Sequence, residues 1–174
     1  MTFTAHMAWH MALVVVFAPL FAAILKATPY DPVPRAPSLF SPLVACLAEF
    51  VIVWMWHLPP FHTAARQDVG WFALEQISFA VAAVYFWMSI IGGPSIAQPS
   101  RSAAGLVALV VTFAHMTMLG ALIALAPRPL YGHGSLDDQQ RGGALMIVVT
   151  AIVYPLTAAW LARGLMAARA GSRA

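Results

Sequence analysis

The chain has 174 residues, of which 61% are hydrophobic and 9% are charged, and its mean hydropathy is +0.81. A soluble domain carries about 25% charged residues, so this composition excludes a soluble globular protein and, equally, a disordered chain. The single cysteine, Cys46, excludes an intrachain disulfide and a CxxC motif. The basic residues are scattered between apolar runs rather than clustered, which argues against a nucleic-acid partner. The class that remains is an integral membrane protein in a lipid bilayer.

Five apolar segments are long enough to cross a bilayer, which takes about 20 residues. Prolines and glycines mark several of their ends, such as Pro59-Pro60 after the second segment and Pro127 after the fourth. The first segment lacks a basic N-terminal region, which favours a retained span over a cleaved signal peptide. We therefore expect one all-α membrane domain, residues 1–174. Its expected spans are about 3–25, 38–58, 71–91, 103–126 and 142–162.

The distribution of basic residues predicts the orientation of these spans. Five spans place the termini on opposite sides, and the side richer in Lys and Arg is cytoplasmic. One side carries Arg66, Arg128 and Arg141. The other carries Lys26, Arg35, Arg101, Arg163, Arg169 and Arg173. We expect an outward N-terminus and a cytoplasmic C-terminus.

This orientation collects the histidines on one side of the membrane. They fall in its outer half or beyond it: His6, His10, His57, His62, His115 and His133. His6 and His10 are four residues apart and share a helix face, with Met7 and Met11 on the neighbouring stripe. His57 ends the second span, and His115 shares a face of the fourth span with Met118. Imidazole and thioether together suit copper, and a thioether selects Cu(I).

The sequence therefore predicts an outward-facing copper site made from His6, His10, His57, His115, Met7, Met11 and Met118. Two carboxylates inside spans, Glu49 and Glu75, are expected to orient the imidazoles. The same residues also have a purely structural interpretation. Histidines and a neutral glutamate also bond between helices, and methionines also fill cores. His62 and His133 are expected in loops, and Asp137 and Asp138 are expected to cap the fifth span.

Motifs for several enzyme classes are missing. GxxxxGK[ST], GxGxxG, GxSxG and HExxH do not occur in the sequence. We expect no enzymatic activity.

Four motifs, in order along the chain, resemble one known family. They are HMAWHM (6–11) with APL (18–20), WHLPP (56–60), LEQISF (74–79) with FW (86–87), and APRPLY (126–131) with DQQ (138–140). Together they resemble the CtaG-like cytochrome c oxidase assembly factors, from about residue 3 to about residue 162. Family members commonly have about seven spans, and this chain is expected to begin where the third would start. Gln76 stands where the resemblance leads us to expect a histidine.

The resemblance implies a role in copper-centre maturation of cytochrome c oxidase at the outer face of the bacterial inner membrane. The implied partners are oxidase subunits or other copper proteins. Carried over by position, the family's motif residues are His6, His10, His57, Glu75, Asp138 and Gln139.

Three functions are consistent with the sequence. The first is a membrane factor that holds copper transiently and assists oxidase assembly. The second is a b-type haem electron carrier with axial histidines such as His10 and His115. The third is a cofactor-free structural subunit of a respiratory complex, whose polar residues serve helix packing.

Overall fold

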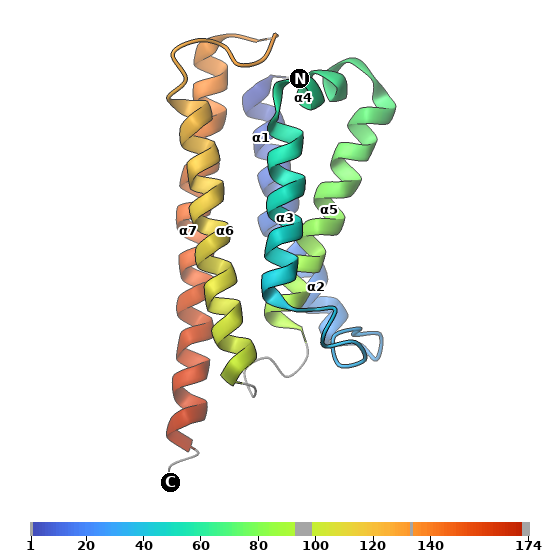
Figure 1. Ribbon diagram of the computed structural model, residues 1–174, viewed down its shortest axis with the longest axis vertical. Helices are drawn as coiled ribbons and strands as arrows, with labels where there is room; N and C mark the ends of the chain where they lie inside the picture. The colour runs from blue at the N-terminus through green and yellow to red at the C-terminus, as the bar shows by residue number, and fades with distance from the viewer. Residues whose placement is uncertain (1, 93–98, 133, 172–174) are drawn as a thin grey trace.

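The computed structural model describes residues 2–92, 99–132 and 134–171, and within these ranges every regular element is a helix (Figure 1). The elements are α1 (Phe3–Ala12), the π-helical segment η1 (Leu13–Phe17), α2 (Ala18–Lys26), α3 (Pro42–His57), α4 (Pro59–Gln67), α5 (Val69–Ile91), α6 (Pro99–Ala124) and α7 (Leu136–Gly171). The predicted all-α membrane bundle is confirmed. His133 lies outside the described residues.

Four helical stretches are long and apolar enough to cross a membrane: Phe3–Lys26, Val69–Ile91, Ser100–Ala124 and Leu136–Ala167. The pair α3 and α4 meets the same test only when taken together, as one span broken by a 70° bend. Two helices differ in extent from the expected spans. Residues 38–41 precede α3 and are not α-helical, and α7 begins at Leu136, before the expected start of the fifth span near Gly142.

The bend between α3 and α4 follows from two prolines. The residue before a proline avoids the helical conformation, and Leu58 accordingly has φ −67° and ψ 135°. Pro59 and Pro60 then occupy the first turn of α4, where a missing N–H costs nothing. The segment after His57 was expected to be a loop, and this is wrong. The prolines end one helix and start another that lies across the end of the bundle (Figure 1).

A second proline shapes the first span. Pro19 has no N–H to donate to the turn before it, and the helix widens to a π-turn over Leu13–Phe17. The Trp87 indole N–H donates to the Val14 carbonyl at 2.7 Å. This bond satisfies a carbonyl inside the widened turn and joins the first span to α5.

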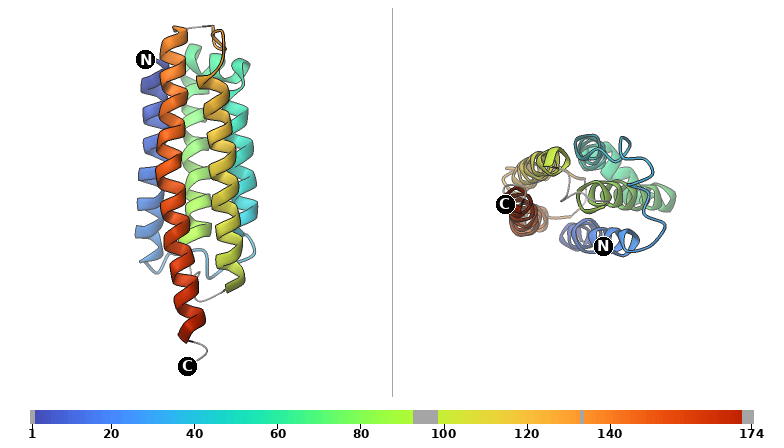
Figure 2. Two further views of the ribbon diagram at one scale, coloured as in Figure 1. Left: turned by 90° about the vertical axis from the view of Figure 1, so that its left-hand side faces the viewer. Right: turned by 90° about the horizontal axis from the view of Figure 1, so that it is seen from below.

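The helices close into a ring. α6 and α7 make the most extensive contact, α7 packs on α1, α2 packs on α5, and α3 lies between α5 and α6 (Figure 2). The α6–α7 crossing depends on glycines: a Cβ on Gly143 would lie 2.6 Å from the Ala124 nitrogen and 2.7 Å from the Gly120 oxygen. Small residues of this kind allow close helix approach in membranes.

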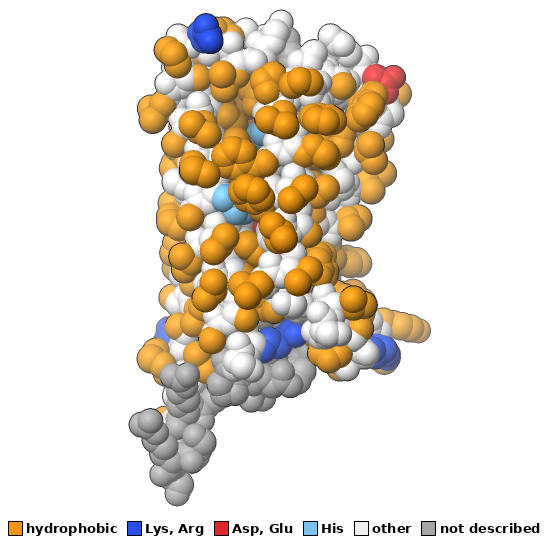
Figure 3. All heavy atoms as spheres, viewed as in Figure 1, with side chains coloured by type: hydrophobic (Ala, Val, Ile, Leu, Met, Phe, Trp, Pro, Cys, Tyr) orange, Lys and Arg blue, Asp and Glu red, His pale blue; other side chains and the backbone are white. Residues whose placement is uncertain are grey.

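The surface has the polarity of a membrane protein. Apolar side chains cover most of its height, and Lys and Arg gather at the end away from α4 (Figure 3). The positive-inside rule places that end in the cytoplasm, and this orientation stays a prediction.

Replacing Gly143 with Ala should destabilise the bundle by about 1–3 kcal/mol, because the new methyl group meets backbone atoms that cannot move independently. Gly132→Ala is the matched control, since a Cβ there has no atom within 4 Å. Thermal unfolding in detergent should show a lower midpoint for Gly143→Ala alone. Equal midpoints for both variants would contradict the close crossing.

Candidate metal centre

Three buried side chains from three helices converge where α4 crosses the bundle. They are His6 on α1, His62 on α4 and Glu75 on α5, which we call the His–Glu triad. One donor atom from each lies within 4.8 Å of the other two. The His6 and His62 rings meet edge to face, with centroids 5.2 Å apart. This is the geometry of three potential ligands around one point.

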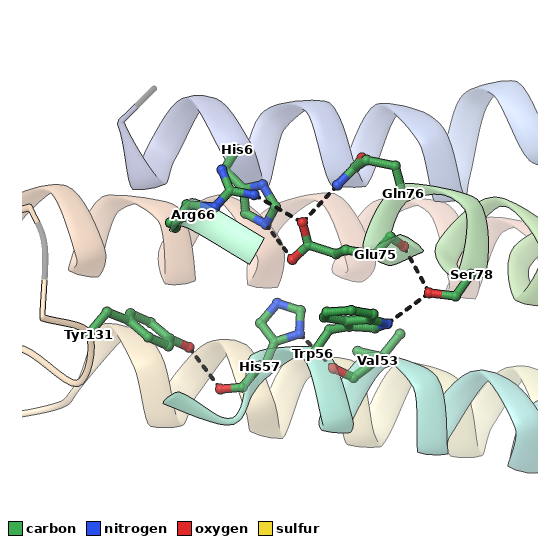
Figure 4. Close-up of polar contacts among 9 residues, drawn as sticks. All are labelled: His6, Val53, Trp56, His57, Arg66, Glu75, Gln76, Ser78 and Tyr131. Carbon is green, nitrogen blue, oxygen red and sulfur yellow. Dashed lines mark hydrogen bonds and ion pairs between the residues drawn. The ribbon is translucent and has the colours of Figure 1, made fainter. Parts of the chain in front are cut away.

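The Glu75 carboxylate is the polar centre of the triad (Figure 4). The His6 Nε2 atom lies 3.5 Å from Oε1, and the Arg66 guanidinium lies 2.9 Å from Oε2. The Gln76 amide also donates to Oε2, at 3.0 Å. Gln76, at the place where a histidine was expected, therefore supports the carboxylate directly.

A second pair of histidines lies one helical turn deeper, about 6 Å along α1. The His10 and His57 rings are 5.6 Å apart between centroids, and Phe79 packs 4.0 Å from His10. The Nδ1 atom of His57 lies 2.7 Å from the Val53 carbonyl, which accepts only if Nδ1 carries the proton. The other nitrogen, Nε2, is then the basic one. We call His10 and His57 the deep histidine pair.

Several buried ring nitrogens have no hydrogen-bond partner in the part of the chain that the structure describes. Four of them belong to the triad and the deep histidine pair, namely Nδ1 of His6, both nitrogens of His10 and Nε2 of His57, and both nitrogens of His115 on α6 are unpartnered as well. An unsatisfied buried polar atom costs about 1–3 kcal/mol. A metal ion bound through one nitrogen of each ring would remove part of that cost, so the histidines of the triad and of the deep histidine pair fit a bound ion.

Sequence reasoning missed two members of this site, His62 and Arg66. Both were placed in an outer loop, whereas α4 directs them onto His6 and Glu75. A signal existed in the spacing. In a helix that starts at Pro59, residues 62, 65 and 66 share one face, and His62 and Ala65 are indeed buried.

The loop between α6 and α7 closes the site from the side. The Tyr131 hydroxyl donates to the His57 carbonyl at 3.1 Å, and its ring lies 4.3 Å from His62. Burial raises the pKa of Tyr131, so the hydroxyl stays protonated and remains a donor. Gln139 holds this loop, accepting from the Leu130 N–H at 2.7 Å and donating to the Ile123 carbonyl.

Asp138 connects the first and last helices. It lies in the first turn of α7, as expected, and its carboxylate also accepts from the N–H groups of Phe3 and Thr4 at 2.6 and 3.2 Å. N–H groups in the first turn of α1 have no carbonyl partner within the helix, and a negative charge is favourable there. Asp138 therefore fixes the start of the helix that carries His6 and His10.

The other predicted site residues have different surroundings. His115 packs against Phe50, with ring centroids 5.1 Å apart. Met7 is buried against Gly142 of α7, Met11 is buried in the core, and Met118 is half exposed on α6. His115 is not in the group of His, Cys, Asp and Glu side chains that converges at the triad, and the methionines stay predicted ligands.

Glu49 belongs to a separate buried cluster. Its carboxylate accepts from the Thr112 hydroxyl at 3.3 Å, and that hydroxyl lies 3.3 Å from the Cys46 sulfur. Eight residues of α3 separate Glu49 from His57, a rise of about 12 Å. Of the two predicted carboxylates, Glu75 is therefore the one placed to orient a histidine of the triad.

Comparison with known proteins identifies the family. Residues 1–168 match the cytochrome c oxidase caa3 assembly factor family. The chain belongs to this family. No curated protein and no solved structure gives a significant match. Membership establishes that the chain is an oxidase assembly factor acting with oxidase components, and the apolar helices show that this assembly factor is a multi-pass membrane protein. The family is described by an assembly role rather than by a reaction.

Asp138→Ala should destabilise the assembly factor by about 1–2 kcal/mol, the usual cost of losing a helix cap. Asp137→Ala is the matched control, because Asp137 is exposed and its ion pair among the described residues is with Arg141, one turn along α7. Hydrogen exchange should show faster opening at the start of α1 in Asp138→Ala. Equal exchange in both variants would show that the interhelix bonds contribute nothing.

Proposed function

We propose that this assembly factor holds a copper ion at the His–Glu triad while the oxidase copper centre is being built. The observation that carries the proposal is the convergence of His6, His62 and Glu75 within 4.8 Å, inside a bundle whose surface is mostly apolar. Charged and imidazole groups are rare at such positions unless they have a function.

The choice of copper combines the donor set, which fits copper, with the family role, which favours copper over zinc. Imidazole nitrogens suit copper and zinc alike, so the donor set by itself leaves both open. The family role in assembling cytochrome c oxidase favours copper, since the resemblance implies maturation of that enzyme's copper centres. When bound, copper is cargo for the oxidase rather than a reacting centre.

The deep histidine pair gives the ion a second position. A copper ion at the triad would lie about one turn from the nitrogens of His10 and His57. The hydrogen bond from His57 to Val53 holds that ring with Nε2 open. We therefore propose that the ion moves between the His–Glu triad and the deep histidine pair during loading and release.

Arg66 opposes binding. Its guanidinium lies 2.9 Å from the same carboxylate that a metal would share. A cation at the triad must displace Arg66 or tolerate its charge. We propose that this competition keeps binding weak enough for release.

His6→Ala and His62→Ala should each weaken copper binding to the purified protein. The loss should be at least as large as the about 10–100-fold caused by removing the outer partners of metal ligands. His115→Ala is the control, since that ring packs on Phe50. Binding is measured by metal analysis after equilibrium dialysis with Cu(I) and with Cu(II), on samples of unchanged helix content.

Three outcomes would contradict this proposal. One is negligible copper binding by the unmodified protein, and another is a loss of copper binding in His115→Ala equal to that in His6→Ala. A Soret band in the visible spectrum of the purified protein would favour the haem alternative.

Arg66→Gln should raise copper affinity by about tenfold or more, because two unit charges about 4 Å apart interact by about 4 kcal/mol near a protein surface. Arg66→Lys keeps the charge and should bind copper like the unmodified protein. Arg141→Gln, an exposed site at the same end, controls for overall charge. An affinity that falls or stays constant in Arg66→Gln would show that Arg66 does not compete with the metal.

A further inference from the structure

At the end of the bundle away from the metal centre, α2 and α7 separate and leave a groove of about 480 Å³ between them. Pro19 and Ala23 of α2 form one wall, and Thr157 of α7 forms part of the other. Trp87 and Ile91 of α5 form the floor. The volume falls in the range of small-molecule binding sites.

The groove exists because of local sequence. α7 packs on α1 rather than α2, so the two walls diverge below the π-turn. Ala23 and Thr157 have small side chains that do not refill the space. Trp160, half exposed, and Lys26 lie at the groove, where an aromatic ring and a cation are typical of a membrane interface.

A second groove offers a comparison within the same molecule. It lies between α2 and α5, has a volume of about 490 Å³, and is lined by apolar side chains and Tyr85, with Phe21, Ala80 and Met88 among them. No charged residue lines it. The two grooves thus match in size and differ in charge.

We infer that the α2–α7 groove binds an anionic phospholipid, with an acyl chain over Trp87 and the phosphate at the Lys26 ammonium. The charge complementarity argues for this occupant. A cationic side chain at one end of an otherwise apolar groove matches an anionic headgroup followed by a hydrocarbon chain. Arg163, one turn beyond Trp160, lies at the same end of the bundle but does not line the groove. The inference is independent of the metal centre.

Native mass spectrometry of the full chain tests the site, with phosphatidylglycerol and phosphatidylcholine of identical acyl chains as probes. The unmodified protein should retain phosphatidylglycerol in preference to phosphatidylcholine. Lys26→Gln should reduce that preference by about fivefold, the effect of one lysine near an anionic lipid surface. Ala23→Leu should reduce retention of phosphatidylglycerol, because the longer side chain fills the groove.

Two matched variants separate this site from general surface charge and general apolar contact. Arg163→Gln removes a cation from the same end, and Ala80→Leu fills the second groove. Both should keep the headgroup preference. Equal losses in Lys26→Gln and Arg163→Gln would overturn the inference. A second result would also overturn it: the unmodified protein retains no lipid, and Ala23→Leu abolishes co-purification of an oxidase subunit. That result would identify the groove as a protein interface.

Discussion

The Glu75 carboxylate is fully buried, and a buried charge without partners costs several kcal/mol. Three helices supply partners for the carboxylate: Arg66 of α4 and Gln76 of α5 hydrogen-bond one oxygen, and His6 of α1 lies 3.5 Å from the other, which has no hydrogen bond among the described residues. Because these partners belong to different elements, satisfying the carboxylate also fixes how the elements meet. The same contacts that hold this end of the bundle together place nitrogen and oxygen donors around one point.

This arrangement links stability and function through competition. Arg66 neutralises Glu75 in the absence of a metal, and a bound cation would take over that role. One turn deeper than the triad, Phe79 and the hydrogen bond from His57 to Val53 hold the deep histidine pair, whose basic nitrogens have no hydrogen-bond partner among the described residues. The proposed copper carrier would use both features, namely a site ordered before binding and a charge that favours release.

The sequence predicted much of the fold because lipid imposes a simple rule on composition. Long apolar runs must be helices, since backbone groups in hydrocarbon have to bond within their own segment. The expected spans 3–25, 71–91 and 103–126 accordingly match observed helices within a few residues. The rule is weaker where a helix breaks. Pro59-Pro60 was interpreted as a stop, and only the backbone shows that it is a bend followed by α4.

The sequence by itself determined the membrane class, the helical architecture, the family, and the pairing of His6 with His10 on one face, because these depend on composition, local order and helical period. The tertiary structure alone decided which polar groups meet. It brought His62 and Arg66 to Glu75, and it placed His115 against Phe50 and Glu49 beside Thr112. The reason is geometric: helical period fixes which residues share a face, but which faces oppose one another depends on bends and on how closely helices approach.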